Sequence, residues 1–143
     1  MTTQEFRQFS PSAPEKERIA QQLAEKLKAK PEVRFAFVYG SFLRGTFRDI
    51  DVGVFLEESQ VPLEEQLEYQ LNLLEELSPL TEYPLDVRVI NGAPLAFRYN
   101  VTCGRLLFTR DEALLAQFIE RTRDQYFDFL PVIEKYLEEF ARG

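Results

Sequence analysis

Apolar side chains follow two periodicities in the first part of the chain, and each periodicity predicts a different element. A helix is predicted from Pro14 to about Ala29, because apolar residues recur there every four positions after a proline suited to a first turn. Residues 33–39, VRFAFVY, are rich in β-formers, and residues 49–56, DIDVGVFL, alternate. Both runs predict strands.

The pattern then changes back to helix and again to strand. Pro62, followed by two glutamates, opens a second helix. Residues 84–90 and 104–108 predict the third and fourth strands. The second helix is expected to bury one stripe of leucines. This stripe consists of Leu63, Leu67, Leu71, Leu74 and Leu77.

A long helical region is predicted after residues 109–112, TRDE, which have the spacing of a capping box. Pro131 lacks a backbone N–H, so a kink or break is expected near Leu130. The aromatic residues of YFDFL, residues 126–130, are more typical of a core than of a partner surface, and both interpretations stay open.

This order of elements predicts an α/β domain of the α+β type. We expect a small mixed β-sheet with helices packed on one face, followed by C-terminal helices. We expect one domain over residues 1–143, with residues 1–13 loosely held.

Composition excludes several kinds of chemistry. The chain has no histidine, so Ser-His-Asp and Cys-His catalysis and histidine-ligated zinc are excluded. A net charge of −7 argues against direct nucleic-acid binding. The single cysteine, Cys103, permits no internal disulfide, and we expect it to be a small buried or half-buried residue. No apolar run is long enough to span a membrane, so we expect a cytoplasmic protein without a membrane partner.

Alternation places Asp49, Asp51 and Gly53 on one face of the second predicted strand. The two aspartates are about 7 Å apart at Cα. Like charges this close are unfavourable without a cation between them, and oxygen ligands suit Mg²⁺ or Mn²⁺. On the same face, Gly53 either leaves room for a nucleotide or marks a β-bulge.

The third strand repeats the arrangement with Asp86 and Arg88 on one face. If the second and third strands are neighbours, Asp86 joins the aspartate pair. Three carboxylates can hold two metal ions about 3.5–4 Å apart for phosphoryl transfer. Arg88 either touches substrate or pairs with an acid.

A Gly-Ser pair, Gly40 and Ser41, ends the first strand. A strand that turns into a helical start after glycine exposes backbone N–H groups and a hydroxyl, and such a corner binds phosphate. Arg44 and Arg48 follow closely, and each either contacts phosphate or pairs with nearby acids.

These motifs resemble one family. GSFLRG followed by DID, with LDV on a later strand, resembles the nucleotidyltransferase fold of the DNA polymerase β superfamily. Within it, the chain resembles the minimal nucleotidyltransferases (MNT proteins) that are paired with HEPN-domain toxins. The downstream segments that carry this resemblance are INGAPLAFRYNV, GRLLFTRDE and RTRDQYFDFLPVIEKY.

The resemblance implies an Mg²⁺-dependent enzyme that transfers AMP from ATP to a tyrosine of its cognate HEPN toxin and so acts as an antitoxin. It implies two Mg²⁺ ions, with Asp86 also helping to activate the acceptor hydroxyl. The implied metal-binding and catalytic residues are Asp49, Asp51 and Asp86. The implied nucleotide-binding residues are Gly40, Ser41 and Arg44.

Two other functions stay open. A noncatalytic antitoxin would neutralise its partner by binding alone. The hint for it is the seven-residue connection 42–48 between Ser41 and Asp49, which is shorter than is usual in the family. A nucleotidyltransferase acting on a small molecule such as an aminoglycoside is the third possibility, because an acidic surface attracts cations.

Overall fold

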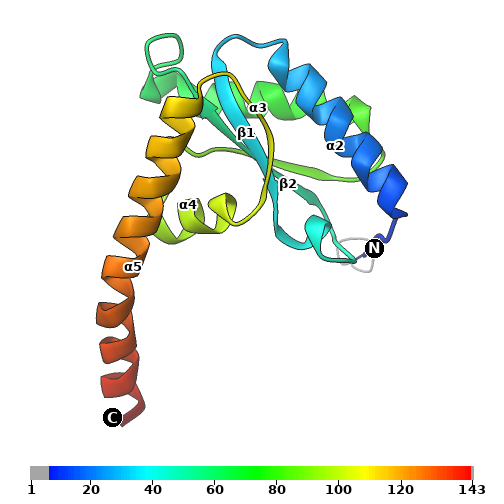
Figure 1. Ribbon diagram of the computed structural model, residues 1–143. Helices are drawn as coiled ribbons and strands as arrows, with labels where there is room; N and C mark the ends of the chain where they lie inside the picture. Colours follow the sequence, from blue (N-terminus) through cyan, green and yellow to red (C-terminus); the bar gives the residue numbers. More distant parts are fainter. Residues whose placement is uncertain (1–6, 143) are drawn as a thin grey trace.

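A four-stranded mixed sheet forms the centre of the protein in a computed structural model that describes residues 7–142 (Figure 1). The strand order is β3-β2-β1-β4. β1 pairs antiparallel with β2 and β4, while β2 and β3 are parallel. The prediction of a small mixed sheet is therefore confirmed. The strands are β1 (Val33–Tyr39), β2 (Ile50–Leu56), β3 (Leu85–Val89) and β4 (Arg105–Thr109).

Each predicted helical region contains a helix, and the structure adds one short helix. That addition is α4 (Leu95–Thr102), which the sequence pattern did not reveal. The remaining α-helices are α2 (Ala13–Lys28), α3 (Gln66–Leu77) and α5 (Glu112–Arg142). Three short 3-10 turns are η1 (Gly40–Leu43), η2 (Leu63–Glu65) and η3 (Ser78–Leu80).

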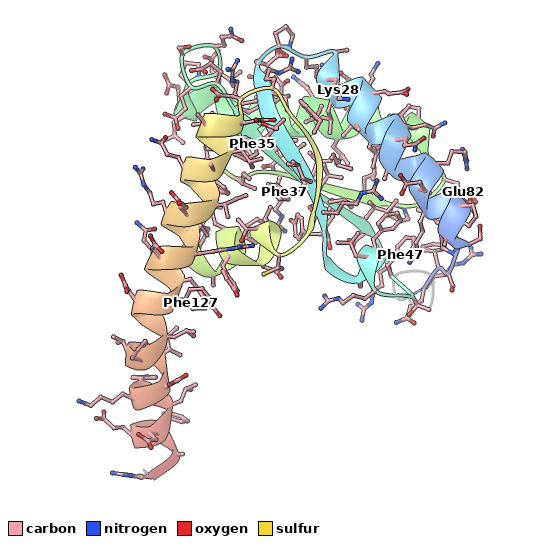
Figure 2. The ribbon with its side chains drawn as sticks, in the orientation of Figure 1. Lys28, Phe35, Phe37, Phe47, Glu82 and Phe127 are labelled. Carbon is pink, nitrogen blue, oxygen red and sulfur yellow. The ribbon has the colours of Figure 1, made fainter. Side chains whose placement is uncertain are left out.

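Helices cover both faces of the sheet, which corrects the expectation that they pack on one face. α2 and α3 cover the face formed by Ile50, Val52 and Val54, which are fully buried. The C-terminal helices α4 and α5 lie on the other face, where Phe35 stacks on Phe55 at 4.8 Å between ring centroids. Figure 2 shows Phe35 and Phe37 pointing from β1 toward this second layer.

The predicted leucine stripe of α3 is wrong for three of its members. Leu63, Leu67 and Leu71 are 70%, 67% and 56% exposed. The helix is rotated relative to the expected stripe, because it packs through Leu73 and Leu77 and buries a glutamine on the same side. The buried residues of α3 are Gln66, Leu73 and Leu77.

The expected break near Leu130 does not occur, because α5 continues through Pro131 to Arg142. The interpretation of the aromatic run as core is also wrong in part: Phe127 and Phe129 are 53% and 49% exposed. The missing N–H of a proline costs one hydrogen bond but need not end a helix whose other bonds remain.

The expectation that residues 1–13 are loosely held falls in part on residues 1–6, which lie outside the described residues. Within the rest, the Phe9 N–H donates to the Phe47 carbonyl at 2.8 Å, and the Phe9 ring lies 4.9 Å from that of Tyr83. None of the helices within residues 7–142 combines the length and the apolar content that a membrane crossing requires.

Candidate functional site

Three acidic side chains meet where β2 begins beside β3. Asp51 lies opposite Asp86 in the parallel register of these strands and opposite Tyr39 in the antiparallel register with β1. Asp49 directly precedes β2. One carboxylate oxygen from each of the three aspartates lies within 4.8 Å of the others. The structure thus brings together the carboxylates that the sequence placed on two strands.

Crowding of these charges changes the chemistry of the central carboxylate. Burial raises the pKa of Asp51 to about 6, the charges of Asp49 and Asp86 act in the same direction, and Arg88 opposes them. A cluster of half-buried carboxylate oxygens that repel one another fits a hard divalent cation such as Mg²⁺, which supplies the missing positive charge.

Arg88 is an ion-pair partner of the acidic cluster. Its Nε donates to Oδ1 of Asp86 at 3.3 Å, and this bond raises the pKa of the guanidinium. The guanidinium also lies 5.5 Å above the ring centroid of Phe97 in α4. The sequence left open whether Arg88 touches substrate or pairs with an acid, and the structure shows the ion pair with Asp86.

The Gly-Ser corner touches the acidic cluster directly. Gly40 has φ of +82°, and a Cβ at this position would lie 2.5 Å from Oδ2 of Asp51. Both the backbone angle and the space therefore require glycine. The side chain of Ser41 is exposed, and its carbonyl accepts from the N–H groups of Arg44 and Gly45. Gly40, Ser41 and Asp51 form one continuous surface.

Lys16 of α2 holds the η1 turn from the outside. Its Nζ donates to the carbonyl oxygens of Phe42 and Gly45 at 2.7 and 2.8 Å. The ammonium group also lies 5.3 Å from the ring centroid of Phe42 and 5.5 Å from that of Phe47. Sequence reasoning missed this residue, because its only local signal is a lysine on the polar side of an amphipathic helix.

A hollow opens beside Gly40, between η1 and the end of α4. It is continuous with the Gly-Ser corner, and the predicted nucleotide-binding residue Arg44, whose side chain is exposed, contributes to its wall. Cys103 is exposed here, which corrects the expectation that it is buried. The lining residues are Gly40, Leu43, Arg44, Asn100, Cys103 and Gly104.

Gly53 does not leave room for a nucleotide. A Cβ there would lie 3.1 Å from Ile90 Cγ2 and 3.2 Å from Val101 Cγ1. The residue also pairs in register with Phe37 and Arg88, so no bulge occurs at this point. Its lack of a side chain instead lets α4 pack closely on the sheet.

The sequence matches the model of one protein family. The family described as "Polymerase beta, Nucleotidyltransferase" matches residues 21–113, a span that contains all three clustered aspartates and the Gly-Ser corner. No curated protein sequence matches the chain.

Among solved structures, the chain is similar in fold to proteins from toxin-antitoxin complexes. The chain resembles a protein in the crystal structure of the toxin-antitoxin MntA-HepT, with a TM-score of 0.64, 15% identity, and coverage of 87% of this chain and 97% of the other. It also resembles a chain in the complex of tri-AMPylated Shewanella oneidensis HEPN toxin with MNT antitoxin (TM-score 0.61, 16% identity, coverage 87% and 99%). A third match is a toxin-antitoxin structure with AMP-PNP (TM-score 0.60, 16% identity, coverage 86% and 98%). These likenesses show a shared fold.

Proposed function

The chain belongs to the polymerase β-type nucleotidyltransferase family, and we propose that it transfers AMP from ATP to a tyrosine hydroxyl of a HEPN-domain toxin. It would thereby act as the antitoxin of a toxin-antitoxin pair. The acceptor is proposed from the structural matches, which are complexes of antitoxins with toxins, one of them with a tri-AMPylated HEPN toxin.

One observation carries the chemical part of the proposal. The carboxylates of Asp49, Asp51 and Asp86 converge to within 4.8 Å at the edge of the Gly-Ser corner. Like charges held this close by strand register are costly unless they bind cations. The ion pair of Arg88 with Asp86 does not relieve this repulsion, because burial and the charges of Asp49 and Asp86 still raise the pKa of Asp51 to about 6. The cluster thus suits divalent metal ions and the phosphates they accompany.

Asp49, Asp51 and Asp86 are the residues proposed to hold Mg²⁺, in two ions by analogy with phosphoryl-transfer sites. Bound Mg²⁺ would neutralise phosphate charge and stabilise the leaving pyrophosphate.

The chain's own residues have two further tasks, one in binding phosphate and one in accepting a proton. Gly40 and Ser41 offer backbone and hydroxyl donors to the terminal phosphates of ATP, with Arg44 beside them. The acceptor oxygen forms a bond to the α-phosphorus, while the bond from that phosphorus to the pyrophosphate oxygen breaks. A carboxylate oxygen of Asp86 takes the proton of the acceptor hydroxyl, since no histidine is available as a base.

The test is the intact mass of the cognate HEPN-domain toxin, which we expect to be encoded beside this chain, after incubation with the chain, ATP and Mg²⁺. Mass increases of one or more AMP groups are expected, and they should vanish in the double variant Asp49→Asn and Asp51→Asn. The variant should still fold, because both residues are only partly buried and asparagine has nearly the same size as aspartate. Tandem mass spectrometry then identifies the modified tyrosine.

Other outcomes of the same experiment would select the alternatives. An unchanged mass together with a stable complex, formed equally well by the double variant, would indicate an antitoxin that acts by binding alone. Transfer of label from ATP to an aminoglycoside, but not to the protein, would indicate a small-molecule enzyme.

A further inference from the structure

The second half of α5 projects beyond the rest of the protein (Figure 1). The first half packs against α4 and the sheet, with Leu115 and Thr122 buried. The last stacked contact between α5 and the rest of the protein joins Tyr126 to Tyr99 of α4, with 3.8 Å between ring centroids. Phe127, labelled in Figure 2, lies where the helix leaves this contact. We call residues 127–142 the α5 arm; it is about 24 Å long.

The arm is strongly apolar at the surface. Tyr136, Leu137 and Phe140 are 66%, 58% and 75% exposed. At 3.6 residues per turn, most of the apolar side chains fall within about 120° of the helix circumference. Such a stripe is typical of a helix face that another structure covers. The stripe begins at Tyr126, one residue before the arm, and continues through Phe129, Leu130, Ile133, Tyr136, Leu137 and Phe140.

The stripe continues the side of α5 that already packs against the body. Leu115, Phe118, Ile119 and Thr122 lie at the same angular positions one to three turns earlier, and they face α4 and the sheet. The exposed stripe therefore extends past the body on the sheet face that also carries Asp51 and Asp86. A protein seated on the arm would lie next to α4 and on the side of the acidic cluster.

Charge indicates what kind of protein fits. The arm has four acidic side chains against two basic ones, and Glu134 and Glu139 flank the stripe on either side. A second copy would bring the same acids and a net charge of −7 against this surface. An apolar ridge bordered by Lys and Arg is complementary instead.

We propose that the α5 arm is the docking surface for the protein that receives AMP, and this inference rests on the proposed function. The arm would bind an apolar ridge with a basic border on the toxin and hold its acceptor tyrosine on the metal-binding face of the sheet. Binding would then be separate from chemistry, since no residue of the arm belongs to the acidic cluster.

The experiment compares two matched double variants with the wild-type chain. Leu137→Glu with Phe140→Glu changes the arm. Leu67→Glu with Leu71→Glu changes equally exposed leucines of α3, which lies on the opposite face of the sheet. The probe is the same cognate HEPN-domain toxin, titrated calorimetrically without ATP. Circular dichroism and binding of ATP with Mg²⁺ check the fold of each variant.

The arm variant is expected to bind at least about 30-fold more weakly, and the α3 variant within about twofold of wild type. The inference would be overturned if the arm variant bound the toxin as tightly as the wild-type chain does. It would also be overturned if the α3 variant lost as much affinity as the arm variant, or if the wild-type chain formed no complex. So would a wild-type homodimer in sedimentation velocity that the arm variant dissociates, because a second copy would then occupy the surface. A complex that depends on the arm but yields no AMP transfer would leave the docking inference standing and refute the proposed function.

Discussion

The acidic cluster and the α5 arm differ in how their side chains are held. In the cluster, strand register fixes Asp51 against Asp86, and a missing side chain at Gly40 leaves the space that Asp51 occupies. In the arm, Phe127 still packs on Tyr99 of α4, but the side chains beyond it are mostly exposed to solvent. The proposed chemistry thus lies where the structure tolerates least change, and the proposed recognition lies where it tolerates most. Substitutions in one region can therefore test AMP transfer and toxin binding separately.

The largest effect is expected from Asp86→Asn. Because Asp86 is the proposed metal ligand and proton acceptor, its loss should lower the rate of AMP transfer by about 10³-fold. Affinity for the toxin should stay within about twofold, because the arm is untouched. Single-turnover kinetics and calorimetry measure the two quantities. The exposed Asp124→Asn is the matched control; if it slowed transfer as much, a general charge effect would replace the site-specific one.

Gly40→Ala tests how little change the cluster accepts. The new Cβ would meet Oδ2 of Asp51 at 2.5 Å and would also occupy an unfavourable φ of +82°. We expect a loss of about 100-fold in transfer and about 1–2 kcal/mol of stability. Gly45→Ala is the control, because φ there is +155° but nothing lies within 4 Å of its Cβ. Affinity for Mn²⁺ should fall in Gly40→Ala and be unchanged in Gly45→Ala. If it fell equally in both variants, backbone strain and not contact with Asp51 would be the cause.

Lys16→Met tests whether the Gly-Ser corner needs support from outside. It removes both hydrogen bonds to the η1 turn while keeping a long apolar stem. We expect KM for ATP to rise about tenfold with a smaller change in kcat, and partial recovery with Lys16→Arg. Lys26→Met, on an exposed position of the same helix, should change neither. An unchanged KM in Lys16→Met would show that the turn holds itself.

The smallest effect concerns pH in the metal-free protein. The pKa of Asp51 is raised to about 6 in the folded state, so the folded protein binds a proton more tightly than the unfolded chain does. Its contribution to stability is therefore present at low pH and is lost as pH rises through 6. Asp51→Asn should raise the Tm in EDTA by a few degrees at pH 8 and by little at pH 4.5. A larger gain at pH 4.5 would contradict this sign.

Most of the cluster could be predicted from sequence, because its geometry follows from strand alternation. Asp49 and Asp51 must share one face of an alternating strand, and Asp86 repeats the pattern. That β2 and β3 are neighbours came only from the structure. The support from Lys16 could not be predicted, because it joins residues that are 26 and 29 positions apart.

Helical faces were harder to predict for a physical reason. Periodicity shows that a helix has an apolar face, but tertiary packing decides which face is covered. In α3 the sheet covers Leu73 and Leu77 and leaves Leu67 in solvent. α4 was missed because its eight residues have little intrinsic helix preference, and it is stabilised by contacts with α5 and β1. The exposed aromatics of the arm look like core residues in sequence for the same reason.

The strand order also determines the course of folding during synthesis. β1 pairs with β4 through residues that are about 70 positions apart, such as Phe35 with Thr109. The backbone groups along one edge of β1 therefore stay unpaired until the ribosome has synthesised β4, which ends at Thr109. Long-range pairing of this kind slows folding and leaves an edge open to wrong partners. The acidic cluster, complete by Asp86, can form on a nascent chain whose sheet is still unfinished.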